Sequence, residues 1–404
     1  MSDRTHRVHN RAANRLWLGL PIVAGACAFA GCGSVGVSER TEALPPEQAC
    51  KQLADDLVGA VPKVDQIRLL AESKLSKKTV TVVPLVDLKT GDQSAAMQAC
   101  DGVLARQFAA AQSLFEVRPF STDDVAKAGY AVLTASEVAT ATAGQTNVRL
   151  RAALVDAKSS SVLSRVAIVA RSEGATRLPT PFFRDSPVLV RDQILESHQA
   201  TLQPNADKAH PRLMQDLNVR AQLAAPIDMY NRERYPEALR EFKSVAATSQ
   251  GDTLTSHVGV YVAGSRVGSE QDVAASSERI VEKGLEAKQL DFKIFFRPDS
   301  VIPYSNPPFD TMRMVVPAAN KIGTTRRCLT IVGHTSKTGG AAYNKALSLR
   351  RAEFIRDAMV RANPDVRSRI TVDGKGFDES IVGNGRDDDT DMADRRVEFR
   401  TREC

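Results

Sequence analysis

The apolar and polar positions of this chain divide it into segments with strand spacing and segments with helix spacing. In the first half, four runs are rich in β-branched residues or alternate in polarity, and an apolar stripe with helical spacing follows the first run. Pro84 interrupts that first run, which predicts an edge strand or a bulge there. Ser94 is a candidate cap for the helix. The strand-like runs are 79–87, 115–120, 148–152 and 162–169. The order β-α-β-α-β-β over residues 47–172 predicts an α/β sandwich.

Residues 187–285 contain no convincing strand run and are predicted to be helical. Within 229–242, Tyr235-Pro236-Glu237-Ala238-Leu239 resembles the opening of a helix in a tetratricopeptide repeat, and a proline suits that first turn. No clean 34-residue period is present. The segment therefore holds one or two degenerate repeats, or else an unrelated helical linker.

The last third returns to alternating strands and helices. Strands are predicted at 290–296, 329–333, 369–374 and 396–401, and helices at 309–323 and 342–362. Residues 286–404 thus form a βαβαββ domain, and the fold class of the whole chain is α+β.

The first 31 residues have the pattern of an export signal. Arginines from Arg4 to Arg15 precede an apolar run at 16–29, which is short for a transmembrane helix. Phe29-Ala30-Gly31-Cys32 resembles a bacterial lipobox, which implies cleavage before Cys32 and acylation of that cysteine. A plain secretory signal or an uncut anchor is the alternative. Gly33 in place of an aspartate favours the outer membrane by the same resemblance, and residues 32–46 are predicted to be a tether.

Composition adds little beyond ordinary globular character. Apolar residues make up 43% of the chain and charged residues 25%, with a net charge of +6. The signal carries four arginines and one aspartate, so the chain after residue 31 has a net charge of +3. That charge is too weak to favour nucleic acid as a partner.

Export places the remaining cysteines in an oxidising compartment. Cys50, Cys100, Cys328 and Cys404 allow three pairings. Domain locality favours Cys50 with Cys100 and Cys328 with Cys404.

The residues that carry a recognisable motif are concentrated in the last third of the chain. The segments are Gly333-His334-Thr335-Ser336, Tyr343-Asn344, Leu347-Ser348, Arg351-Ala352 and Arg395-Arg396-Val397-Glu398-Phe399. Together they resemble the peptidoglycan-binding motif of the OmpA-like carboxyl-terminal domain, over residues 286–404. Residues 47–172 also resemble, by strand order and the opening Val82-Val83-Pro84-Leu85, the amino-terminal domains of TolB-like and FlgO-like envelope proteins.

Arg351 falls on the apolar stripe of its predicted helix, and a buried charge needs a carboxylate partner from the protein or from a ligand. The OmpA-like resemblance implies a ligand, the diaminopimelate carboxylate of a peptidoglycan stem peptide. Ser336 stands where the family has an aspartate for the ligand's ammonium. A neutral serine hydroxyl cannot balance that ammonium, so three outcomes are open. The ligand is bound more weakly, a nearby acid such as Asp299 takes the place of the missing aspartate, or the domain binds a different partner. Asn344 is expected to tie the loop to the helix, and it also matches a family position close to the ligand, as does Thr335. Arg395 and Arg396 match the family's paired arginines, of which one often faces the pocket and the other is usually solvated.

No catalytic or metal site is predicted. His334 and Ser336 have no oriented acid beside them, and the same His-Thr occurs in non-enzymatic family members. Asp387 to Asp389 with Asp391 lack the glycine and glutamate of a calcium loop and are expected to be a solvated loop. We therefore expect no cofactor and no enzyme activity.

The sequence favours a lipid-anchored outer-membrane protein, facing the periplasm, that binds peptidoglycan non-covalently. The alternative is an envelope assembly module of a flagellar, secretion or transport complex, whose amino-terminal domain binds a protein partner.

Overall fold

The computed structural model describes residues 35–73, 77–111, 114–142, 145–172, 178–287, 289–294, 296, 300–303, 310–381, 385, 391 and 394–404. The signal segment, Cys32 and Asp299 lie outside these residues. The α+β fold class is confirmed.

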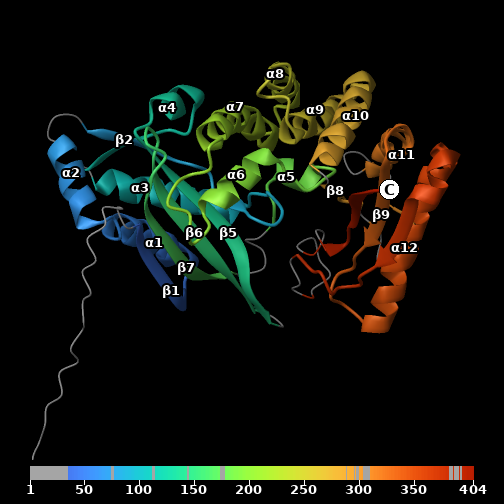
Figure 1. Ribbon diagram of the computed structural model, residues 1–404, viewed down its shortest axis with the longest axis horizontal. Coiled ribbons are helices and arrows are strands. Elements are labelled where there is room, and N and C mark those ends of the chain that lie inside the picture. Colours follow the sequence, from blue (N-terminus) through green and yellow to red (C-terminus); the bar gives the residue numbers. More distant parts are fainter. Residues whose placement is uncertain are drawn as a thin grey trace, which may run out of the picture. The chain divides into compact units, whose positions relative to one another are not determined.

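Seven of the described strands form one sheet, in the order β1-β7-β6-β5-β2-β4, with β3 paired to β5 (Figure 1). Their bounds are β1 Gly36–Leu44, β2 Lys78–Val82, β3 Val86–Asp87, β4 Phe115–Arg118, β5 Tyr130–Thr142, β6 Gln145–Asp156 and β7 Val162–Ser172. The helices between them are α1 Pro46–Gly59, α2 Lys63–Ser73, α3 Ala95–Ala110 and α4 Thr122–Lys127. Ser94 caps α3 by accepting a hydrogen bond from the Met97 amide at 3.3 Å, as predicted.

Apolar clusters cover both faces of this sheet. On one face, Leu53 and Leu57 of α1 and Leu104 and Phe108 of α3 pack against the strands. On the other face, Leu213 and other residues of helix α7 (Leu213–Asn231) pack against the sheet. The inner strands are therefore buried on both sides, which explains the apolar residues along them.

The tether predicted for residues 32–46 is wrong. Residues Gly36–Leu44 form β1, which pairs in parallel with β7, and α1 begins directly afterwards at Pro46. The side chains of β1 are mostly exposed, and Val37 is 67% exposed. Because this strand is held by backbone hydrogen bonds at the sheet edge rather than by an apolar face, it leaves no hydrophobic pattern in the sequence.

Pro84 is not on an edge strand, because β2 lies between β5 and β4. The chain instead leaves β2 after Val82 and resumes as β3 at Val86, with Pro84 in the gap. The missing proline N–H therefore interrupts one inner strand.

The helices predicted for residues 187–285 are present, and one short helix precedes them. The elements are α5 Pro181–Asp185, α6 Gln193–Thr201, α7 Leu213–Asn231, α8 Tyr235–Ala246, α9 Leu254–Val267 and α10 Glu270–Glu286. Pro236 lies in the first turn of α8. A Cβ at Gly259 would lie 2.2 Å from the Phe242 ring, so α8 and α9 approach closely. The repeat-like origin of these helices stays a prediction.

The last third contains β8 Gln289–Phe292, the 3₁₀ turn η2 Thr311–Met314, α11 Val315–Thr324, β9 Arg327–Gly333, α12 Ala341–Ala362, the 3₁₀ turn η3 Pro364–Arg369, β10 Ile370–Gly374 and β11 Val397–Glu403. The strands form a four-stranded sheet in the order β10-β9-β11-β8. β10 and β9 are parallel, and β11 runs antiparallel to both of its neighbours. This sheet and α12 position the site described below.

One apolar cluster continues from the helical segment into this second sheet. It includes Phe242, Tyr261 and Ile280 of the helices and Phe292 and Phe399 of the strands. A Cβ at Gly284 of α10 would lie 2.2 Å from Leu290 of β8, and the Tyr261 hydroxyl donates to the Asp310 carbonyl at 3.0 Å. The sequence boundary at residue 286 therefore does not divide the core.

Two disulfides link cysteines that are distant in sequence. Cys50 of α1 pairs with Cys100 of α3, and Cys328 of β9 pairs with Cys404. This is the pairing that domain locality favours. Among the described residues, no helix combines the length and apolar character needed to cross a membrane.

Candidate functional site

Two glycines bring α12 directly against the strands beneath it. Gly333 ends β9 and pairs with Gly374 of β10. A Cβ at Gly333 would lie 2.0 Å from the Ser348 carbonyl oxygen, and one at Gly374 would lie 2.5 Å from the Leu349 amide nitrogen. Only glycine permits this approach. The first turns of α12 therefore lie beside the loops that leave β9 and β10.

The inward face of α12 holds these loops through polar side chains. The Asn344 amide donates to the Thr338 carbonyl at 2.8 Å and to the Gly340 carbonyl at 3.3 Å, which closes the loop after β9. The Ser348 hydroxyl accepts from the Gly376 amide at 2.8 Å. Asn344 and Ser348 are four residues apart and so share one helix face. One face of α12 thus fixes both loops.

Arg351 continues this face and is 2% exposed. Its Nε donates to the Ser300 carbonyl at 3.1 Å, and its guanidinium lies 4.7 Å from the centre of the Phe296 ring. The predicted position of Arg351 on the core side of the helix is therefore correct. Cation–π stacking and a carbonyl acceptor orient the planar group within a desolvated site.

The loop after β9 carries Thr335 and Ser336. The Thr335 amide donates to the Gly376 carbonyl at 2.8 Å. Thr335 is 2% exposed and Ser336 is 6% exposed. The Thr335 hydroxyl has no hydrogen-bond partner within the described part of the chain, so it retains capacity for a further polar group.

The structure thus places Asn344 and Arg351 on one face of α12, with Asn344 near its beginning and Arg351 near its middle. Ser348, which lies between them, reaches the loop of Thr335 through Gly376. Arg395 is partly exposed and lies two residues before β11. Asp391 is fully buried, so the expectation of a solvated loop is wrong at that residue. Asp387 to Asp389 lie outside the described residues.

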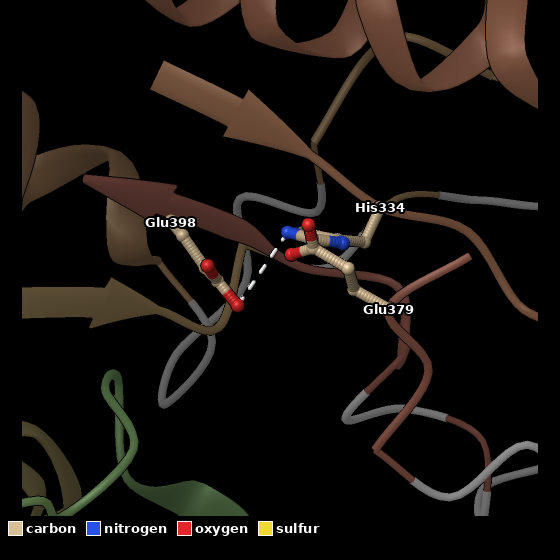
Figure 2. A group of neighbouring side chains, drawn as sticks. All are labelled: His334, Glu379 and Glu398. Atoms are coloured by element: carbon tan, nitrogen blue, oxygen red, sulfur yellow. Dashed lines mark ion pairs between the residues drawn. The ribbon is translucent and has the colours of Figure 1, made fainter. Parts of the chain in front are cut away.

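An ion-pair cluster next to this site was not predicted. Figure 2 shows His334, Glu379 and Glu398 close together. His334 follows β9, Glu379 lies in the turn after β10, and Glu398 belongs to β11. Glu398 accepts from Arg396 Nε at 2.8 Å and from Arg400 Nε at 3.0 Å, and Arg400 also pairs with Glu379. The sequence feature that could have predicted this cluster is the alternation of Arg396, Glu398 and Arg400, from the residue before β11 into the strand. Alternate residues of a strand share one face.

Electrostatics fix the charge states in this cluster. Burial raises the pKa of the Glu398 carboxyl, but the nearby His334 and the charges of Arg396 and Arg400 outweigh it and leave the pKa well below its ordinary value. Burial, with the nearby Arg396, lowers the pKa of His334. His334 Nε2 lies 3.4 Å from Glu398 Oε1 without hydrogen-bond geometry. The cluster therefore holds an ionised Glu398 beside a neutral imidazole.

The same three residues have ligand atoms within 4.8 Å of one another, which is compatible with a metal ion in distance alone. Both carboxylates already accept from guanidinium groups, however, and a cation would have to approach two arginines. That charge environment disfavours a metal ion and favours a brace between β11 and the loop after β10.

A cleft of about 540 Å³ borders this brace. Glu379 and Arg396 line one side, and Arg191 and Glu196 line another. Thr335, Ser336, Asn344, Arg351 and Arg395 are not among its lining residues.

Residues 310–393 match the OmpA family, so the chain carries an OmpA-family domain near its carboxyl end. A search of curated proteins found no relative of the chain.

Solved structures similar to this chain include the periplasmic domain of MotB, with 18% identity over 29% of this chain and 63% of that one, at a TM-score of 0.24. The peptidoglycan-associated lipoprotein from Burkholderia pseudomallei is 21% identical over 27% of this chain and 88% of that one, at a TM-score of 0.25. The cell wall anchor of the T6SS from Pseudomonas aeruginosa is 18% identical over 32% of this chain and 96% of that one, at a TM-score of 0.25. The chain therefore spans less than two thirds of the MotB domain.

Proposed function

We propose that this chain is an outer-membrane lipoprotein that binds peptidoglycan non-covalently through its OmpA-family domain and so links membrane to cell wall. The observation that carries the proposal is one face of α12, which carries both the buried Arg351 guanidinium and Asn344, the residue that closes the loop of Thr335 and Ser336. The proposed role is binding without chemistry.

The geometry suits a carboxylate ligand. A planar guanidinium can hold a carboxylate by two parallel hydrogen bonds, and these are strong where water is excluded. Stacking on Phe296 fixes the plane of the Arg351 group. We propose that it takes the diaminopimelate carboxylate of a stem peptide, with the Thr335 and Ser336 hydroxyls as neutral partners for the remaining polar atoms.

Membrane attachment is proposed from the sequence at residues 29–32, which resembles a lipobox. Each buried methylene contributes about 0.8 kcal/mol, so several acyl chains on Cys32 would hold the chain stably in a membrane. Cys32→Ser should release the protein from the outer-membrane fraction into the periplasmic fraction.

Wall binding is tested by co-sedimentation with purified diaminopimelate-type sacculi. Arg351→Met keeps much of the side-chain volume and removes the charge, and the expected loss is about ten- to a hundredfold in affinity, the value of a charge-assisted contact. Arg350→Met is the matched control, because Arg350 is the exposed neighbour on the same helix. Melting curves verify that both variants fold. Equal retention of the two variants would refute the proposed role of Arg351.

One observation favours the assembly module as a second candidate. Ile67 of α2 is 67% exposed and Leu70, one turn later, is 44% exposed, so α2 presents apolar surface in the amino-terminal domain. A photo-crosslinker at position 67 that captures one dominant protein, with sacculus binding intact in the absence of that protein, would support this alternative.

A further inference from the structure

The parallel strands of the seven-stranded sheet, apart from the short β3, begin at the same end of the sheet. The register pairs Gly36 of β1 with Ser164 of β7, Val80 of β2 with Tyr130 of β5, and Lys78 of β2 with Phe115 of β4. The antiparallel β6 ends there, because Asp156 pairs with Tyr130. We call this end of the sheet, where the parallel strands begin, the leading edge.

Lysines from separate segments gather at the leading edge. Lys77 and Lys78 lie at the start of β2. The Lys127 carbonyl accepts from the Thr79 hydroxyl at 3.0 Å, which places Lys127 beside that strand.

Two further lysines complete the group. Lys158 lies in the turn between β6 and β7, where the Ala157 amide donates to the Gly129 carbonyl at 3.0 Å. Lys208 forms a β-bridge with Ser161 at the start of β7. Lys77, Lys127, Lys158 and Lys208 are exposed, and within the described part of the chain none of these four forms an ion pair.

Two aspartates, Asp156 and Asp207, also lie at this edge, and both interact with other groups of the chain. The Asp156 carboxylate accepts from the Lys158 and Ser159 amides, each at 2.9 Å. Asp207, whose carbonyl pairs with Val162, interacts electrostatically with the buried Arg165. These two aspartates keep their negative charges, but the five lysines outnumber them, so the leading edge carries an excess of positive charge.

Val35, which follows Cys32 by three residues in the sequence, lies at this same edge. Val35 packs against the cluster that includes Val162 and Ala209, one residue before β1 begins. Three peptide units join the Cα atoms of Cys32 and Val35, and at 3.8 Å each they span at most about 11 Å. That reach is close to the roughly 8–10 Å over which salt screens charges, so an acyl anchor at Cys32 would hold the lysines within range of a membrane surface.

We infer that the leading edge is a membrane-facing surface that binds anionic phospholipid headgroups. The inference rests on the lipid attachment at Cys32 proposed above. One lipid signal with a polybasic patch is a recognised way to strengthen membrane attachment. Each lysine near an anionic surface contributes about fivefold in affinity, so three contribute about a hundredfold.

The test uses the mature chain from residue 32 carrying Cys32→Ser, so that neither the apolar signal segment nor an acyl group masks the contribution of the lysines. Co-flotation is measured with vesicles of phosphatidylglycerol mixed with phosphatidylethanolamine, and with vesicles of phosphatidylcholine alone. The chain should float with the anionic vesicles only and should be released by salt. Lys127→Gln, Lys158→Gln and Lys208→Gln together should weaken binding about a hundredfold.

The matched control is Lys51→Gln, Arg361→Gln and Arg367→Gln, which removes the same charge from exposed positions elsewhere. This control should bind anionic vesicles like the parent chain. Equal binding by the two triple variants, or no preference for anionic vesicles, would overturn the inference. The assay contains no cell wall and no acyl group, so a failure of wall binding or of acylation is detected separately, by sacculus binding and by fractionation.

Discussion

The serine at position 336 offers the sharpest test of the wall-binding proposal. Ser336→Asp would restore the acid that the OmpA-like motif carries at this place. Ser336 is only 6% exposed, and its loop is fixed by the Thr335 amide bond to Gly376. A carboxylate introduced there is desolvated, which costs about 1–3 kcal/mol of stability in the ligand-free chain.

Ligand binding should change in the opposite direction. The ammonium of diaminopimelate would exchange a hydroxyl acceptor for a carboxylate, and a charge-assisted hydrogen bond contributes about 1.5–3 kcal/mol. Affinity should therefore rise about ten- to a hundredfold while the melting temperature of the free chain falls. A gain in affinity coupled to a loss of stability distinguishes this mechanism from general stabilisation of the loop.

The assay is titration with a soluble stem peptide, repeated with a peptide whose diaminopimelate amine is acetylated. Ser336→Asn is the control, because asparagine has the shape of aspartate without its charge. The gain should be confined to the aspartate variant and to the free amine. Equal affinity of the two variants, or an equal gain for the acetylated peptide, would refute the assignment of Ser336 to the ammonium.

Three further predictions concern stability and are measured by denaturant or thermal unfolding. Glu398→Gln should cost about 3–5 kcal/mol, because the buried Arg396 loses its charged acceptor; an unchanged midpoint would show that the brace is dispensable. Burial and the charge of Arg220 lower the pKa of His198 to about 3, so the unfolded chain takes up a proton first. Stability should therefore fall by up to about 1.4 kcal/mol per unit as pH drops from about 6.5 towards about 3, and His198→Gln should reduce that slope. Cys50→Ala with Cys100→Ala opens a 50-residue loop and should cost about 4 kcal/mol without reducing sacculus binding, whereas reduced binding would show that the two ends of the molecule are coupled.

Periodicity predicted those parts of the fold in which one face is buried. The strands of the second sheet and helix α12 were found close to their expected bounds, because apolar residues recur on their buried faces. The edge strand β1 was missed because its side chains are mostly exposed and its partner β7 is more than 100 residues away along the chain. Such non-local backbone pairing leaves no local signal.

The candidate site was predictable in part for a similar reason. The position of Arg351 on the core side of α12 follows from helical spacing, and the structure buries it there. Its contact with the Ser300 carbonyl joins segments 51 residues apart, which spacing cannot reveal. The brace around Glu398 also needed Glu379, whose approach depends on the loop after β10.

The apolar cluster shared by α10 and β8 has a mechanical consequence. If the domain binds the wall as proposed, a pull on it would meet a closely packed apolar contact, in which Leu290 lies directly against Gly284 of α10, rather than a compliant joint. Apolar seams yield cooperatively, because separating them exposes their whole area to water at once. Tension between wall and membrane would then be resisted up to a threshold and released abruptly, in contrast to the gradual stretching of a linker.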